Sequence, residues 1–429
     1  MSLAVLELND QALLIHTEQG QCLSEPGFAQ LTTKGIETGE VARSVAWRSP
    51  QASFNQYWRQ LNQLPLPSSQ RWARHNADIA FAQIQQLLKG VNAPQQLILS
   101  VPGSFSDEQL SLLTGLIEAS SSQLHAVIDS ALAAGLDCQN PTWIVELQLH
   151  QAVVSLIQPQ NHSGQASIEI VQQELIPDLG IMTIYNSVAR HISNRLVTDH
   201  RYDPLHSSEG EQTIYDQIPT WLSTLAIKPE ITISVSSPKG ELPLVLRKNE
   251  IAELIEGRLS KLTDILKISE KTEVHFTQSG GLISQLVSRF ATAQLLSATQ
   301  GSQNCFLAGQ HISSESQQLH RIRSLKMGLL SDKIKANHTP QEIFASHLLY
   351  ENHAWSLATA VSIYLKNDQL SIKSGADKNA ALIVVIKDSE LSVLHQQSGI
   401  DVRLPRDSQP GSAIIIAGHQ VNLIEVNHA

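Results

Sequence analysis

Apolar runs and polar turns follow the same order in two distant stretches of this chain. Val5 to His16 reads V-L-E-L-N-D-Q-A-L-L-I-H, and Ile144 to Ser155 reads I-V-E-L-Q-L-H-Q-A-V-V-S. In each stretch an apolar run reaches a glutamate, Glu7 or Glu146, passes a polar turn and continues from Gln-Ala into a second apolar run. The pattern predicts two β-hairpins that open two halves of the chain. The alternative is two ordinary hairpins that share these dipeptides by coincidence.

The clearest strand-to-helix unit lies between residues 96 and 120. Leu97 to Val101 is an apolar run of strand length, and Pro102-Gly103 ends it. Ser106 is placed to cap a helix whose first turn is acidic, where the helix dipole favours negative charge. A short strand and an alanine-rich helix are predicted to follow. The helix after Ser106 is supported by apolar residues at helical spacing, namely Leu110, Leu113, Leu116 and Ile117. The same spacing predicts an earlier helix in residues 77–88, with Ile79, Ile84, Leu87 and Leu88 on one face.

Beyond about residue 326 the pattern changes to short apolar runs separated by turns. The polar stretch from Lys335 to Glu342 is typical of a linker, and the runs after it predict a small all-β sandwich or barrel. We therefore predict an α/β core over residues 1–330, with halves at about 1–140 and 141–330, and a β-rich C-terminal domain over residues 341–429.

Composition narrows the classes of function. The 429 residues suit two or three domains, and the net charge of −10 argues against binding to nucleic acid or to acidic membranes. Cys22, Cys138 and Cys305 are too far apart for a metal motif or a disulfide framework, which suits a reducing compartment. The start of the chain lacks a basic leader, and no run approaches the ~18–20 apolar residues of a spanning helix. We expect a cytoplasmic protein without membrane insertion.

Two adjacent motifs carry a resemblance to a known family. V-P-G-S-F-S-D-E-Q, Val101 to Gln109, and V-I-D-S-A-L-A-A-G-L, Val127 to Leu136, resemble the V-P-x-x-F-x-D-x-Q and I-x-E-P-x-A-A-A motifs of DnaK-type heat-shock chaperones. Ser279 to Ile283 resembles the glycine turn that lies beside adenine in that family, and Cys305 to Gly309 resembles its closing helix. The resemblance covers residues 1 to about 325.

The resemblance implies an actin-like fold, in which two ribonuclease H-like lobes enclose ATP and Mg²⁺. Hairpin turns from both lobes bind the phosphates in such proteins, and a carboxylate polarises the attacking water. The positions that match these roles are the turns after Glu7 and Glu146, the carboxylate Asp129, the phosphate-loop residue Gly180, and the adenine-side Gly280 and Gly281.

The residues at these positions depart from the family pattern. Neither hairpin turn contains Gly, Ser or Thr, although backbone contact with phosphate and hydroxyl contact with Mg²⁺ require small residues. Asp178 to Ile181 keeps a single glycine. Asp216 to Ser223 lacks both lysines of the family's adenosine-binding helix and contains Pro219, which a helix interior tolerates poorly. We therefore predict a core that does not hydrolyse ATP and that has no cofactor, or binds ATP or ADP without turnover.

Other candidate chemistry is sparse. The seventeen histidines show no H-x-x-x-H and no Cys/His pair at ligand spacing, so we predict no metal site. Glu7 and Glu146 could form an acid–base pair, because the implied fold brings both turns to one cleft. One arginine-rich segment contains several aromatic residues, which favours either a binding surface or ordinary packing, at Trp47, Tyr57, Trp58 and Trp72.

These observations favour a non-catalytic, chaperone-like adaptor or scaffold that binds a protein partner. The first alternative is a divergent ATPase or kinase with rebuilt phosphate contacts. The second is a protein that binds ATP without hydrolysis and acts as a conformational switch. The third is a homo- or hetero-oligomer, such as a filament, built from the core.

Overall fold

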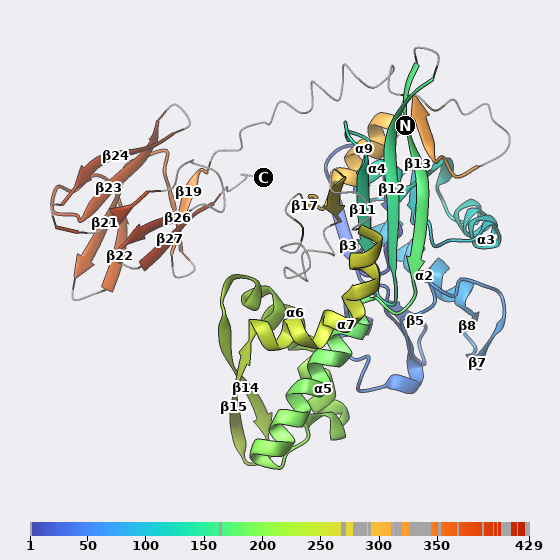
Figure 1. Cartoon of the computed structure of the whole chain (residues 1–429), viewed down its shortest axis with the longest axis horizontal. Helices are drawn as coiled ribbons and strands as arrows, with labels where there is room; N and C mark the ends of the chain where they lie inside the picture. The colour runs from blue at the N-terminus through green and yellow to red at the C-terminus, as the bar shows by residue number, and fades with distance from the viewer. Residues whose placement is uncertain are drawn as a thin grey trace. The chain divides into compact units, whose positions relative to one another are not determined.

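The computed structural model describes residues 2–162, 165–266, 272–277, 290, 293–309, 312, 320–326, 345–350, 353–366, 369–387, 390–397, 399–400, 402–404, 413–417 and 419–424. The chain divides into two compact units, Met1–Lys333 and Ile334–Ala429. The first unit is mixed α/β, which confirms the predicted class, and the described part of the second contains strands and turns without a helix (Figure 1).

The first sheet of the α/β unit has the strand order β10-β9-β1-β2-β3. Strand β2 is antiparallel to both of its neighbours, β1 and β3, whereas β1, β9 and β10 run parallel. The predicted hairpin is confirmed, with Glu7 opposite Leu14 at its turn end. The strands are β1 (Leu3–Glu7), β2 (Leu13–Thr17), β3 (Cys22–Glu25), β9 (Gln96–Val101) and β10 (Gln123–Asp129).

The second sheet repeats this order and adds one strand at its edge. Its order is β17-β16-β11-β12-β13-β18, with an antiparallel β11-β12-β13 and a parallel β11-β16-β17. The second predicted hairpin is therefore also confirmed, with Glu146 opposite Val153. The strands are β11 (Thr142–Leu147), β12 (Ala152–His162), β13 (Gln165–Ile176), β16 (Glu273–Phe276), β17 (Ala293–Leu295) and β18 (Ser324–Lys326).

Four of the described helices belong to the same part of the unit as the first sheet. Ser106 caps α3 as predicted: its hydroxyl accepts a hydrogen bond from the Gln109 backbone N–H at 3.3 Å, and the Gln109 side chain returns a bond to the Ser106 N–H. Helix α2 buries Ile79, Ile84 and its leucines in the core of this sheet. The helices are α2 (Asn76–Gly90), α3 (Asp107–Glu118), α4 (Ser130–Ala134) and α9 (Gln300–Gly309).

Three longer helices and a hairpin share one core with the second sheet. Figure 1 shows them together at one end of that sheet. Helix α6 continues through Pro219, although a helix interior tolerates proline poorly. The helix buries Ile218 and Leu222 on either side of the proline, and this burial offsets the lost backbone hydrogen bond. The elements are α5 (Ile181–His200), α6 (Ser208–Ile227), α7 (Lys248–Leu266), β14 (Glu230–Ser237) and β15 (Gly240–Arg247).

Late segments of this unit return to the first sheet. Helix α9, which follows β17 of the second sheet in sequence, packs against β1, β9 and α4. Ile322 hydrogen-bonds to β10 through its N–H to Val127 O (2.8 Å) and its carbonyl to Asp129 N (3.0 Å), and β18 then pairs with β13. Residues 320–326 therefore tie the two sheets together.

Between β3 and α2 the chain forms several small elements, which include the two-stranded hairpin β7–β8. None of the described helices combines the length and the apolar character needed to cross a bilayer. The small elements of this unit are β4 (Ala29–Leu31), β5 (Ile36–Thr38), α1 (Glu40–Arg43), η1 (Pro50–Ala52), β6 (Ser53–Phe54), β7 (Pro65–Gln70) and β8 (Ala73–His75), with η2 (Pro204–His206) after α5.

The second unit contains two antiparallel sheets, β20-β19-β27-β26-β25 and β22-β21-β23-β24. Leu348 and Leu423 of the first sheet share one hydrophobic core with Ile363 and Val384 of the second, as in a β-sandwich. The strands are β19 (His347–Tyr350), β20 (His353–Ser356), β21 (Val361–Lys366), β22 (Gln369–Ser374), β23 (Leu382–Lys387), β24 (Glu390–Gln396), β25 (Val402–Arg403), β26 (Ala413–Ile416) and β27 (His419–Ile424).

Candidate functional site

The turns of the two repeated hairpins contact each other directly. The Asn9 side-chain amide donates a hydrogen bond to Leu147 O at 3.0 Å, and the Leu149 backbone N–H donates one to Asp10 Oδ1 at 2.7 Å. Asp10 is only 5% exposed. The carboxylate of the first turn therefore occupies the backbone donor that the second turn could offer to an anion.

Burial raises the pKa of the Asp10 carboxyl to about 6, although the Leu149 N–H and the positive charge of Arg59 oppose the shift. The second turn is anchored on its outer side as well, because His150 Nε2 hydrogen-bonds to Asn55 O at 3.0 Å. Polar groups of both turns, Asn9 and Asp10 in the first and His150 in the second, therefore form hydrogen bonds within the protein.

Gly180 lies where the second turn meets the start of α5. The Ile181 and Met182 N–H groups, the first of this helix, donate to the carbonyls of Gln148 (3.0 Å) and Leu149 (2.9 Å). A Cβ atom at position 180 would overlap with backbone atoms of His150 and Leu149. The glycine therefore permits close packing of backbone on backbone, and the helix N-terminus that could bind an anion is already occupied by carbonyl oxygens.

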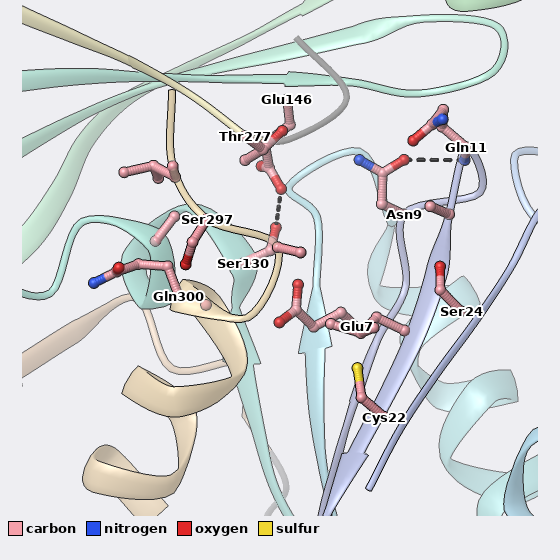
Figure 2. Close-up of a pocket in the computed structure, with 16 residues that line it drawn as sticks. Glu7, Asn9, Gln11, Cys22, Ser24, Ser130, Glu146, Thr277, Ser297 and Gln300 are labelled. Carbon is pink, nitrogen blue, oxygen red and sulfur yellow. Dashed lines mark hydrogen bonds between the residues drawn. The ribbon is translucent and has the colours of Figure 1, made fainter. Parts of the chain in front are cut away.

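A cleft of about 480 Å³ opens beside the two turns. Figure 2 shows Glu7 and Glu146, from β1 and β11, with Ser130 of α4 between their carboxyl groups. Of the residues that line this cleft, the sequence indicates only Glu7 and Glu146 as candidate site residues. The remaining lining residues that the structure describes are Asn9, Gln11, Ala12, Leu14, Cys22, Ser24, Ser130, Ala134, Thr277, Leu296, Ser297, Ala298, Gln300 and Gly301.

Glu7 lies against the first turn of α9. Burial raises the pKa of its carboxyl to about 7, while hydrogen bonding from the backbone and hydroxyl of Ser302 opposes the shift. A Cβ on Gly301 would come within 3.1 Å of Glu7 Oε1, so the helix approaches this carboxyl closely. Ser302 is held in turn by His16, whose Nδ1 lies 2.8 Å from its hydroxyl.

Glu146 is 3% exposed and accepts a hydrogen bond from the Ser130 hydroxyl at 2.6 Å. Burial raises the pKa of its carboxyl to about 8, and the nearby acids Asp129 and Glu7 raise it further. Oε1 of Glu7 and Oε2 of Glu146 have no hydrogen-bond partner among the described residues. The cleft therefore contains two acidic groups that are easily protonated near neutral pH.

Asp129, the position matched to the family's catalytic carboxylate, forms its contacts with other residues of the protein. Its Oδ1 caps α4 by accepting the Ala131 N–H at 3.1 Å, and its Oδ2 lies 3.7 Å from Arg321 Nε and 3.3 Å from Gln173 Nε2. Burial raises the pKa of this carboxyl, and the charge of Arg321 opposes the shift. Asp129 is absent from the described lining of the cleft.

The remaining predicted positions contribute little to the cleft. Gly280 and Gly281 lie outside the described residues. Asp216, at the start of the segment matched to the adenosine-binding helix, pairs with Arg43 at 3.0 Å. The part of the chain that the structure describes contains no cluster of three or more His, Cys, Asp or Glu side chains suited to a metal ion.

The aromatic segment separates into core and surface residues. Tyr57 and Trp58 are buried and both donate hydrogen bonds to Gln83 Oε1, at 2.5 and 2.8 Å. Trp47 stacks on Tyr215 with ring centroids 4.2 Å apart. Trp72, in the turn of the β7–β8 hairpin, is 41% exposed. Ordinary packing therefore explains most of the segment.

No protein-family model matches this chain, and a search of curated proteins also gives no match.

Proposed function

We propose that residues 1–333 form an actin-like core related to DnaK-type chaperones, and that the protein is a non-catalytic, cytoplasmic adaptor or scaffold that binds a protein partner. The repeated sheet order supports the actin-like assignment, because a duplicated sheet with an antiparallel hairpin and parallel inner strands is what the resemblance implies. The return of α9 to the first sheet gives further support.

The observation that carries the loss of ATP chemistry is the contact between the two turns. An actin-like ATPase holds the phosphates between these turns, whereas here Asn9 and Asp10 hydrogen-bond to Leu147 and Leu149 across the same space. A bound polyphosphate would have to break both bonds and displace the Asp10 carboxylate.

The charges in the cleft also argue against the binding of ATP. Its described lining carries Glu7 and Glu146 and includes neither lysine nor arginine. A triphosphate carries several negative charges and requires cationic or N–H donors. The residues present therefore do not fit Mg²⁺-ATP.

Binding of a protein partner is supported by the β7–β8 hairpin. The Arg71 guanidinium lies 5.0 Å from the centroid of the Trp72 ring, and Leu64 nearby in sequence is 69% exposed. Tryptophan and arginine are the residues most enriched where protein interfaces concentrate their binding energy.

One observation favours the alternative of an ATP-binding conformational switch. A cleft of about 480 Å³ is retained between the sheets, and this volume falls in the range of small-molecule sites. This alternative requires phosphate contacts outside the turns described above.

Calorimetric titration with ATP and ADP, with and without Mg²⁺, tests the proposal. We expect no binding at 1 mM nucleotide and no phosphate release, because the turn contacts and the acidic lining exclude the phosphates. Mg²⁺-dependent binding that is lost in Glu7→Gln would refute the proposal and establish the switch. Asp10→Asn tests the cause: if nucleotide binds only to this variant, the Asp10 charge alone excludes it from the native protein.

A further inference from the structure

The two acids of the cleft come from equivalent places in the repeated sheets. Glu7 ends β1 and Glu146 lies one residue before the end of β11, and both line the same cleft (Figure 2). The negative charge of Glu7 raises the pKa of Glu146, so the two carboxyls are electrostatically coupled. Any ligand in the cleft therefore meets both groups.

Each carboxyl has an oxygen that accepts no hydrogen bond from the described residues. Glu146 is 3% exposed, and its Oε2, like Oε1 of Glu7, has no partner among the described residues. A buried polar atom without a hydrogen-bond partner destabilises the folded protein. In the ionised form of each carboxyl these oxygens are acceptors, so a ligand that satisfies them must bring N–H or O–H donors.

Two donors of the lining already have acceptors within the protein. Asn9 donates to Leu147 O, and Ser130 donates to the other oxygen of Glu146. Within the described lining there is no lysine or arginine to neutralise the acids. The charge that complements them must therefore also come from the ligand.

Five apolar residues of the lining are suited to contact an aliphatic chain. Their side chains contribute a methyl or isobutyl surface to the wall, and the cleft volume of about 480 Å³ far exceeds that of one ion. Calcium needs six to eight oxygen ligands, and the described residues offer no cluster of three acidic or metal-binding side chains. The apolar residues are Ala12, Leu14, Ala134, Leu296 and Ala298.

We propose that this cleft binds a linear aliphatic diamine, whose ammonium groups pair with Glu7 and Glu146 and whose methylene chain packs on the apolar wall. Charge-assisted hydrogen bonds from ammonium to carboxylate are among the strongest in proteins. The site is distinct from the partner surface of the proposed adaptor, and a ligand here would bridge the two repeated sheets.

Binding is coupled to proton release. The pKa values of about 7 for Glu7 and about 8 for Glu146 mean that both acids are largely protonated at pH 6 and must ionise to pair with ammonium. Other titratable groups near them are Asp129, next to Glu146, and His16, which contacts Ser302 beside Glu7 and whose pKa burial lowers. The thiols Cys22 and Cys305 also lie near Glu7, and their pKa values are raised by burial and by the charge of Glu7. These thiols stay neutral in this range, so the two glutamates dominate the pH dependence.

Isothermal calorimetry of the full chain with 1,3-diaminopropane, putrescine, cadaverine and n-butylamine tests this inference. We expect at least one diamine to bind at pH 8.5, to bind at least tenfold more weakly at pH 6, and to bind more tightly than n-butylamine. Titrations in two buffers of different ionisation enthalpy at pH 7 should show proton release on binding.

Glu146→Gln keeps the shape of the side chain and should weaken diamine binding at least tenfold, as should Glu7→Gln. Glu37→Gln, at an exposed position on β5, is the matched control and should bind as the native chain does. A cooperative thermal transition in each variant shows that it is folded.

Three results would overturn the inference. They are the absence of heat with every diamine at pH 8.5, unchanged affinity in folded Glu146→Gln, and displacement of the diamine by submillimolar Mg²⁺ or Ca²⁺, which would identify a metal site. The nucleotide titration is independent of these results, so the diamine site and the proposed loss of ATP binding stand or fall separately.

Discussion

Glu7 and Glu146 show how neighbours differentiate two residues that occupy matching places in a repeated hairpin. Ser302 stabilises the ionised form of Glu7, whereas Glu146 has Ser130 as its donor and two acids, Asp129 and Glu7, as neighbours. The pKa of Glu146 is accordingly the higher of the two. At neutral pH the folded protein therefore holds protons that the unfolded chain would release.

This excess of bound protons predicts that both glutamates make the folded state less stable as pH rises. Because their folded pKa values are raised from 4.5, their contribution to the free energy of unfolding falls between about pH 4.5 and pH 8. Glu146→Gln removes one of the two titrations. We expect the variant to gain stability relative to the native chain by about 2 kcal/mol or more between pH 5 and pH 8, measured by urea denaturation.

The comparison between variant and native chain cancels the titration of acids far from Glu146, whereas the coupled Glu7 and Asp129 contribute to the measured difference. Glu37→Gln, which removes a carboxyl from an exposed position outside the cleft, is the matched control. If the stability of Glu146→Gln differs from that of the native chain by an amount that is constant between pH 5 and pH 8, Glu146 does not titrate in the cleft as described.

At the scale of elements, the second turn and helix α5 form one packed unit. The carbonyls of Gln148 and Leu149 receive the first N–H groups of α5, and Gly180 makes the approach sterically feasible. Four N–H groups at a helix start lack partners within the helix, so this contact satisfies two of them. The same contact holds the second turn against the first.

Gly180→Ala is therefore expected to destabilise the protein by about 2–3 kcal/mol, because the backbone atoms that the methyl group meets cannot rotate away. Gly115→Ala is the matched control. Gly115 is exposed in α3 with open space around its Cα, so the substitution should stabilise the protein by about 0.5–1 kcal/mol. Thermal and urea denaturation measure both effects. Equal effects of the two substitutions would contradict the proposed packing role.

At the scale of the molecule, residues 320–326 and helix α9 join two sheets of the same topology into one unit. Arg321 adds a charge contact within this junction, 3.7 Å from the buried Asp129. The exposed Trp72 and Leu64 belong to the segment between β3 and α2, in and next to the β7–β8 hairpin, and this leaves them available to a protein partner.

The adaptor proposal predicts that Trp72→Ala weakens binding of a protein partner at least tenfold while the melting temperature changes little, since the ring is 41% exposed. Partners that cross-link to the immobilised chain in a cell extract are identified by mass spectrometry and compared between variants. Val197→Ser, at a 45% exposed position on α5, is the control. A partner set that is unaffected by Trp72→Ala would place the interface elsewhere, and sedimentation of the pure chain reports whether the partner is a second copy.

The sequence by itself determined the local elements. Both hairpins, the strand before Pro102 and the helix capped by Ser106 follow from apolar periodicity and capping, which depend on residues a few positions apart. The absence of Gly, Ser and Thr from both turns also follows from the sequence alone, because it depends only on which residue types occupy the turns.

The tertiary structure alone decided what those turns do instead. Asp10 bonds to a backbone N–H 139 residues away, and Asp129 faces Arg321. Trp58 is buried on Gln83 while Trp72 remains exposed, although both belong to one aromatic segment. Burial, hydrogen-bond partners and pKa values arise from contacts between segments far apart along the chain, and a pattern of neighbouring residues contains no record of them.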